Sequence, residues 1–203
     1  MIYANAFVIG AVLMGFEMLG SRYLYPYFGG GIGTWAALIS TVLCALTIGY
    51  FIGGMTVDRF PSPLLLAGAI ALAALYLAGV PATADPLMNW ILFAVGDGLA
   101  GTLLAASALL LMPISLLGTL SPVAVRLLVR STQESGSVAG LVYGISTIGS
   151  VFGTLFTTFT LIPAIGSREI TYWFTVVLVV CAASLVLVSK SSTSTVAVPA
   201  NMR

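Results

Sequence analysis

The chain has 203 residues, of which 60% are hydrophobic and only 6% are charged, and its mean hydropathy is +1.13. A soluble domain carries about 25% charged residues, so this composition excludes a water-covered globular protein and indicates an integral membrane protein in contact with the lipid bilayer. The net charge of +1 gives no reason to expect a nucleic-acid partner. The sequence has no histidine, the commonest metal ligand, and we predict neither a metal site nor a cofactor.

Six apolar runs are long enough to cross a bilayer, which takes about 20 residues. They cover 2–20, 35–57, 63–80, 87–117, 137–162 and 170–188. The first run has no basic residue before it and no small-residue cleavage site after it, so we expect a retained helix and not a signal peptide. The pattern predicts a six-helix membrane domain over 1–189. The Ser- and Thr-rich segment 190–203 is predicted to be a disordered cytoplasmic tail.

Basic residues predict the orientation, because they favour the cytoplasmic side of a membrane protein. With the N-terminus inside, five basic residues fall in the inner loops and tail and two in the outer loops: Arg59, Arg126, Arg130, Lys190 and Arg203 against Arg22 and Arg168. We therefore predict a multi-pass protein of the cell (inner) membrane with both termini in the cytoplasm. Aromatic residues then gather near the outer face, as in an interfacial belt: Trp35, Trp90, Tyr23, Tyr25 and Tyr27.

The second and fifth predicted helices share the pattern Thr-Ile-Gly-x-x-x-Gly, one hundred residues apart. The positions that repeat at this separation are Gly49 and Gly149, Gly53 and Gly153, Ser21 and Ser121, and Pro63 and Pro163. Three helices are an odd number, so two matching triplets must cross the bilayer in opposite directions. This predicts a 3+3 inverted repeat, the arrangement of many secondary transporters. The alternative is that the repeated glycines only serve helix packing, which we expect of them in either case.

Two acidic residues fall inside the predicted helices. Glu17 lies toward the outer end of the first helix. Asp97 lies about ten residues into the fourth, or about 15 Å deep at 1.5 Å per residue. Carboxylates inside a membrane are costly and mark ion or substrate paths, so we predict that both bind a proton or a small cation. The alternatives are an ion pair of Glu17 with Arg22 or Arg168, and a later start of the fourth helix that leaves Asp97 near the headgroups.

The segment GGMTVDRF resembles the loop between the second and third helices of the major facilitator superfamily. Five blocks are similar, in this order, to the membrane domain of spermidine-synthase-like fused proteins: FEMLGSRYLYPYFG, TW, IGYFIGGMTVDR, SPVAVRLL and GSVAGLVYGISTIGSVFGTLFTTFTLIPAIGSR. The resemblance implies half of a major-facilitator-like fold. It also implies an inner gate of Asp58, Arg59 and Arg126, in which Asp58 pairs with Arg126 and faces the positive end of a fifth helix from a second protomer. The alternative role of these charges is an ordinary cytoplasmic anchor.

Two functions fit these features. The first is a half-size facilitator-like secondary transporter that works as a homodimer, for polyamines or other small cationic amines with proton coupling. The second is a non-transporting membrane subunit that anchors or serves a separate cytosolic spermidine-synthase-like enzyme. A channel is disfavoured, because no repeated ring of charge is visible. The chain does not contain the family's transferase domain, so we predict no enzyme.

Smaller features concern helix contacts. Gly136 and Gly140 add to a small-residue surface that is compatible with a dimer. Cys44 and Cys181 both lie in apolar runs, and we expect them to pack like small apolar residues and to form neither a disulfide nor a metal pair.

Overall fold

The computed structural model describes residues 1–194, and within this range the protein is entirely helical. Six spans are long and apolar enough to cross a membrane. They are α1 (Ile2–Phe28), α2 (Ile32–Arg59), α3 (Pro63–Val95), α4 (Leu99–Gly118) with the short α5 (Leu120–Leu128), α6 (Ser135–Phe156) with its continuation η2 (Thr157–Leu161) and α7 (Ile162–Ala164), and α8 (Ser167–Ser194). A short helix, η1 (Thr132–Glu134), precedes α6. The prediction of an all-α protein with six candidate transmembrane helices is confirmed.

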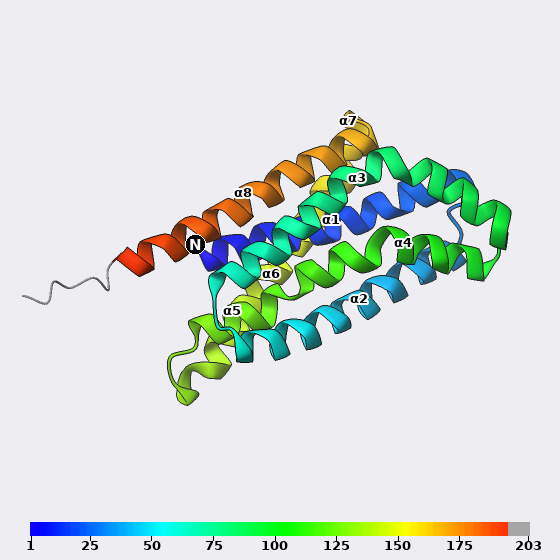
Figure 1. Ribbon diagram of the computed structural model, residues 1–203. Helices are drawn as coiled ribbons and strands as arrows, with labels where there is room; N and C mark the ends of the chain where they lie inside the picture. The colour runs from blue at the N-terminus through cyan, green and yellow to red at the C-terminus, as the bar shows by residue number, and fades with distance from the viewer. Residues whose placement is uncertain (195–203) are drawn as a thin grey trace, which may run out of the picture.

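The start of α1 and the end of α8 lie at the same end of the bundle (Figure 1). We call this the proximal end and the opposite one the distal end. The α1–α2 and α3–α4 connections lie at the distal end. Along the bundle, α1 packs against α6, α2 against α4, and α3 against α8, while α1 also contacts α4 and α8. The two most central helices are therefore α1 and α4.

Several helix boundaries differ from the predicted ones. The predicted break after the third run is wrong, because Pro81 and Pro86 lie inside α3, and Pro26 likewise lies inside α1. A proline removes one backbone hydrogen bond, but neighbouring helices and adjacent turns can keep a membrane helix continuous. The chain breaks instead at 96–98, where Gly96 has a φ of 90° that favours glycine.

The last two connections also differ from expectation. The predicted loop after the fourth run contains α5 and η1. Helix α8 continues to Ser194 and so includes the first residues of the predicted tail. The remainder of that tail, 195–203, lies outside the described residues.

Apolar side chains fill the centre of the bundle. The largest fully buried ones include Phe16, Leu38, Leu66, Leu110 and Ile114. Polar contacts between helices are few. In two of them, the Asn5 amide nitrogen donates to Ser184 Oγ at 3.1 Å, and the Tyr76 hydroxyl donates to the Ala108 carbonyl. Such bonds add modest stability to membrane bundles, on average about 0.6 kcal/mol each, so the fold depends mainly on close packing.

Large apolar side chains also cover the outer surface of the bundle, as a lipid-facing surface requires. Helix α6 is the least buried of the long helices, since it buries only Val142, Gly149 and Gly153 among its residues. The exposed tryptophans lie toward the distal end of their helices, at the start of α2 and α8 and near the end of α3: Trp35, Trp173 and Trp90. Tyr23, in contrast, is buried.

Candidate functional site

A cavity of about 240 Å³ lies between α1, α2, the α4–α5 span and α6. Its hydroxyl-bearing lining residues are Tyr50, Ser121, Tyr143, Ser146, Thr147 and Ser150. Tyr50 of α2 and Tyr143 of α6 are 41% and 46% exposed, so the cavity reaches the surface between these two helices. The sequence analysis did not identify this site. The hydroxyls at Ser146 and Ser150, one helical turn apart, are the signal that could have indicated it.

Close backbone contacts bring the four helices together around the cavity. Gly49 and Gly53 of α2 lie against Ser115 and Thr119 of the α4–α5 span. Gly149 and Gly153 of α6 lie against the backbone of α1, and so does Ser146, which contacts Gly10. A Cβ atom at any of these five glycines would overlap the neighbouring helix, so side chains on α1 and α6 face each other at short range.

Glu17 is buried in α1, with 4% of its surface exposed. Its Oε2 atom has no hydrogen-bond partner among the described residues. The alternative ion pairs are not formed, because Arg168 pairs with Asp85 and Arg22 is exposed without an ion-pair partner in residues 1–194. A charged carboxylate in such surroundings is costly unless a proton or cation joins it.

Glu17 lies on the same face of α1 as the cavity-lining residues. Leu13 and Met14 line the cavity, and Glu17 follows them by four and three residues, which is one helical turn. Gly10, also in the lining, is seven residues away from Glu17, or about 10 Å along the helix axis. Glu17 therefore lies on the cavity side of α1, one helical turn beyond the lining residues in the distal direction.

Asp97 is not inside a helix, and its predicted position near the midplane is wrong. It lies in the three-residue turn between Val95 and Leu99, and it is exposed. The turn sequence Gly-Asp-Gly has ordinary turn chemistry, which outweighed the apolar residues on both sides. Asp97 borders a small pocket with Phe28 and Thr34 at the distal end, far from the cavity lining in sequence and in helix level. The argument for a proton- or cation-binding role at Asp97 is therefore lost.

An ion pair joins Asp58 and Arg126 at the proximal end, with 3.7 Å between Arg126 Nε and Asp58 Oδ1. It links the last turn of α2 to the last turn of α5. Both side chains are more than half exposed, and such pairs contribute at most about 1 kcal/mol to stability. Arg59 is also exposed and forms no ion pair within the described chain. The pair can therefore break and form at little energetic cost.

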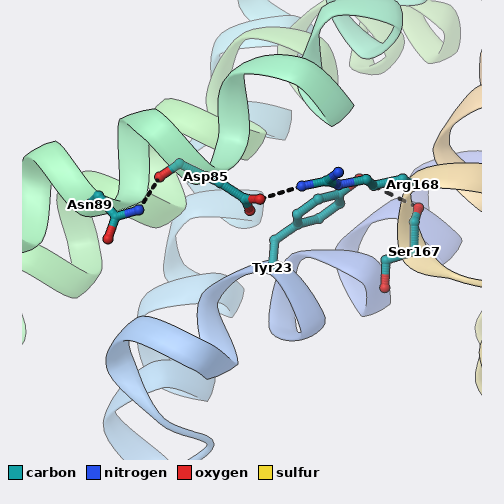
Figure 2. A network of polar contacts seen from close by, with 5 residues as sticks. All are labelled: Tyr23, Asp85, Asn89, Ser167 and Arg168. Carbon is teal, nitrogen blue, oxygen red and sulfur yellow. Dashed lines mark hydrogen bonds and ion pairs between the residues drawn. The ribbon is translucent and has the colours of Figure 1, made fainter.

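A second ion pair, between Asp85 of α3 and Arg168 at the start of α8, lies toward the distal end (Figure 2). The Asn89 side chain donates to the Asp85 carbonyl at 3.0 Å. Beside the pair, the Tyr23 hydroxyl donates to the Ser167 carbonyl at 3.4 Å, which connects α1 to the same point. The sequence analysis missed Asp85 because it assigned this part of α3 to a loop.

Two further observations concern multi-carboxylate metal sites and the two thiols. Within residues 1–194, no group of three or more His, Cys, Asp or Glu side chains could hold a metal ion. Cys181 is buried and Cys44 is exposed, and both are free thiols.

No family model, curated protein or solved structure matches this chain. The likeness to the membrane domain of spermidine-synthase-like proteins therefore stays a prediction from the sequence blocks.

Proposed function

We propose that the protein is a half-size, facilitator-like secondary transporter that works as a homodimer and moves small cationic amines across the membrane. The observation that carries this proposal is the hydroxyl-lined cavity with the buried, unpaired carboxylate of Glu17 one helical turn beyond it. A cation entering the cavity would compensate that carboxylate. Hydroxyl and aromatic groups, such as those of Tyr50 and Tyr143, are suitable partners for an ammonium group.

Support for a 3+3 inverted repeat comes from matching helix contacts. Three contacts between α2 and the α4–α5 span each have a counterpart between α6 and α1. Gly49–Ser115 corresponds to Gly149–Phe7, Gly53–Thr119 to Gly153–Ala11, and Leu46–Gly118 to Ser146–Gly10. In all three pairs, the α6 residue lies 100 positions after the α2 residue, and the partner in the α4–α5 span lies 108 positions after the partner in α1. A chance repeat of a small-residue motif would not bring matching partners with it.

The matching contacts revise one detail of the sequence repeat. At a shift of 108, Ser21 corresponds to Val129, and Ser121 corresponds to Leu13. On this proposed register, Ser21 does not correspond to Ser121 in the first and fourth spans. Those two serines are similar only by position in the sequence.

The repeat also suggests the depth of the cavity. In an inverted repeat, equivalent residues of the two halves meet near the bilayer midplane, where transporters bind their substrates. Gly10 and Gly118 are equivalent at the shift of 108, and both line the cavity. The proposed substrate site therefore lies at the midplane, with Glu17 displaced toward the distal side.

The open side of the cavity supports a dimer. Gly136, Gly140 and Gly144 recur every four residues along α6, and no described atom lies within 4 Å of a Cβ built on any of them. Small residues at this spacing allow two membrane helices to approach closely. A second copy on this face would close the cavity between α2 and α6. Asp58 would then face the N-terminal end of the partner's fifth helix, where the helix dipole is positive.

The two ion pairs fit alternating access. Asp58–Arg126 would close the proximal side, which we predict from the basic residues to face the cytoplasm of a cell (inner) membrane, and Asp85–Arg168 would strengthen the distal side. Because both pairs are partly exposed, each can exchange with water when its side opens. Arg59, beside Asp58, belongs to the proposed proximal gate.

The alternative of a non-transporting anchor for a cytosolic enzyme makes a different demand on Glu17. An anchor has no use for a buried carboxylate without a partner, which only lowers its stability. We therefore prefer transport, with polyamines and related amines as the substrate class that the sequence resemblance suggests.

Uptake into proteoliposomes tests the proposal. The protein should accumulate radiolabelled putrescine or spermidine above protein-free liposomes, and Glu17→Gln should reduce this uptake at least tenfold. Glu169→Gln is the matched control, because Glu169 is exposed in the first turn of α8. If the wild-type protein shows no amine uptake and no proton flux, this result would contradict the transport proposal.

A further inference from the structure

We propose that Glu17 of α1, together with Thr154 and Thr158 of α6, binds a monovalent metal cation of the Na⁺ type beside the cavity. The role of this ion in coupling depends on the proposed function, whereas its binding does not. The proposed site comes from two unpartnered oxygen atoms, the register of two helices and the charge balance of the buried region.

Glu17 is the single buried side chain that carries a charge among the described residues. Within the same range, two buried side-chain oxygens have no hydrogen-bond partner: Glu17 Oε2 and Thr158 Oγ1. Buried polar atoms in proteins nearly always have partners, so each exception calls for a ligand, an ion or a water.

The register of α1 and α6 brings these residues to the same level. The Ser150 hydroxyl donates to the Gly10 carbonyl at 3.3 Å, and a Cβ on Gly15 would meet Thr157 Oγ1. These helices run in parallel, so Glu17, two residues beyond Gly15, is level with the middle of η2. Thr158 lies at that level, and Thr154 lies about one helical turn before it, toward the cavity.

The hydroxyls also share a face of α6. Ser146 and Ser150 line the cavity, and Thr154 and Thr158 continue the same four-residue spacing. On α1, Glu17 continues the cavity-lining face in the same direction. The carboxylate and the two threonines therefore form the distal extension of one polar strip between the two helices.

The backbone at this point is unusual. Thr158 lies in η2, a π-helical segment that covers Thr157–Leu161, and Thr157 is almost fully buried. Short π-helical segments inside α-helices are rare and occur frequently at functional sites. Thr154 donates its hydroxyl to the Ser150 carbonyl at 2.9 Å, which leaves the lone pairs of its Oγ1 free to bind a cation.

The donor set indicates the type of ion. Carboxylate and hydroxyl oxygens suit a hard cation, and one carboxylate neutralises one positive charge. A divalent ion would leave an uncompensated charge in apolar surroundings. Helix α4 has no charged residue, and the charged residues of α2, Asp58 and Arg59, lie at its proximal end, so α2 and α4 contribute neither a second acid nor a competing base near Glu17.

Sodium binding to the purified protein tests the site. We expect Na⁺ to raise the Tm by about 5 °C over an equal concentration of choline, and to bind as ²²Na⁺ in an equilibrium assay. Glu17→Gln should abolish both effects, and Thr158→Val should weaken the affinity about tenfold. Thr160→Val is the matched control, because Thr160 is exposed in the same π-helical segment and should leave binding unchanged.

The outcomes separate this inference from transport. Amine uptake without any Na⁺-specific shift or ²²Na⁺ binding would overturn the ion site and leave the proposed function standing. Na⁺ binding that needs Glu17, in a protein without amine uptake, would support the site and contradict the transporter. A Na⁺ shift that is equal in the wild type, Glu17→Gln and Thr158→Val would also overturn the site.

Discussion

Gly153 of α6 lies directly on the backbone of Ala11 in α1, so a Cβ atom at position 153 would overlap the Ala11 carbonyl. This contact holds the least buried long helix of the bundle against its centre. The equivalent contact in the other half of the chain, between Gly53 and Thr119, holds α2 against the α4–α5 span. The cavity between these helices therefore depends on residues that have no side chain.

Adding a methyl group at Gly153 should separate α6 from α1. We expect Gly153→Ala to lower the free energy of unfolding by about 1–3 kcal/mol, the usual effect of overpacking. Gly79→Ala is the matched control, since no described atom lies within 4 Å of a Cβ built on Gly79, and its effect should stay within about 0.5 kcal/mol. Thermal and denaturant unfolding in detergent measure both. Equal stability of the two variants would contradict the packing described for α6.

The ion pair of Asp58 and Arg126 should matter for transport more than for folding. Asp58→Asn should change the free energy of unfolding by less than about 1 kcal/mol, because the pair is exposed. Amine uptake should fall about tenfold, and combining Asp58→Arg with Arg126→Asp should restore part of it. Arg130→Gln, an exposed change at the same end, is the control. A loss of stability in proportion to the loss of uptake would show that the pair is structural.

The glycine face of α6 should form the contact between two copies. Gly140→Leu should separate the dimer, and the particle mass after subtraction of detergent should fall to that of one chain, 21.0 kDa. Gly79→Leu should leave the mass unchanged, because Gly79 lies on α3, away from this face. A wild-type protein that is monomeric and fully active would contradict the dimer.

The corrected position of Asp97 has a direct consequence. Because this carboxylate is exposed in the α3–α4 turn, Asp97→Asn should keep uptake within about twofold of the wild type and leave stability within about 0.5 kcal/mol. Uptake kinetics and thermal unfolding measure the two quantities. A tenfold loss of uptake would contradict this prediction and indicate that Asp97 takes part in transport.

The sequence was sufficient to predict the number of helices, because each of the six apolar runs is long enough to cross a bilayer as a helix. It failed at the boundaries around Asp97, because the polar and proline-containing segment 81–86 lies inside α3, while the real turn at 96–98 is only three residues long and lies between apolar residues. Prolines were taken as breaks, yet Pro81 and Pro86 lie within a continuous helix. Packing against neighbouring helices keeps that helix continuous, and such packing cannot be predicted from a local sequence pattern.

The site was only partly predictable for the same reason. A buried carboxylate at Glu17 follows from its place in an apolar run, and the Asp58–Arg126 pair followed from the family pattern. The cavity and the position of Thr158 relative to Glu17 depend on the register of α1 against α6. That register is set by contacts such as Gly10 with Ser146, which are 136 residues apart and cannot be read from either helix alone.

Accessibility of the cavity from each side of the membrane tests alternating access most directly. With Cys44 and Cys181 replaced by Ser, a Ser150→Cys probe in the cavity lining can be labelled by a membrane-impermeant thiol reagent in sealed proteoliposomes of known orientation. We predict that Asp58→Asn increases labelling from the proximal side and Asp85→Asn increases it from the distal side. Labelling of this probe from one side only, unchanged by either variant, would contradict a transport pathway through the cavity.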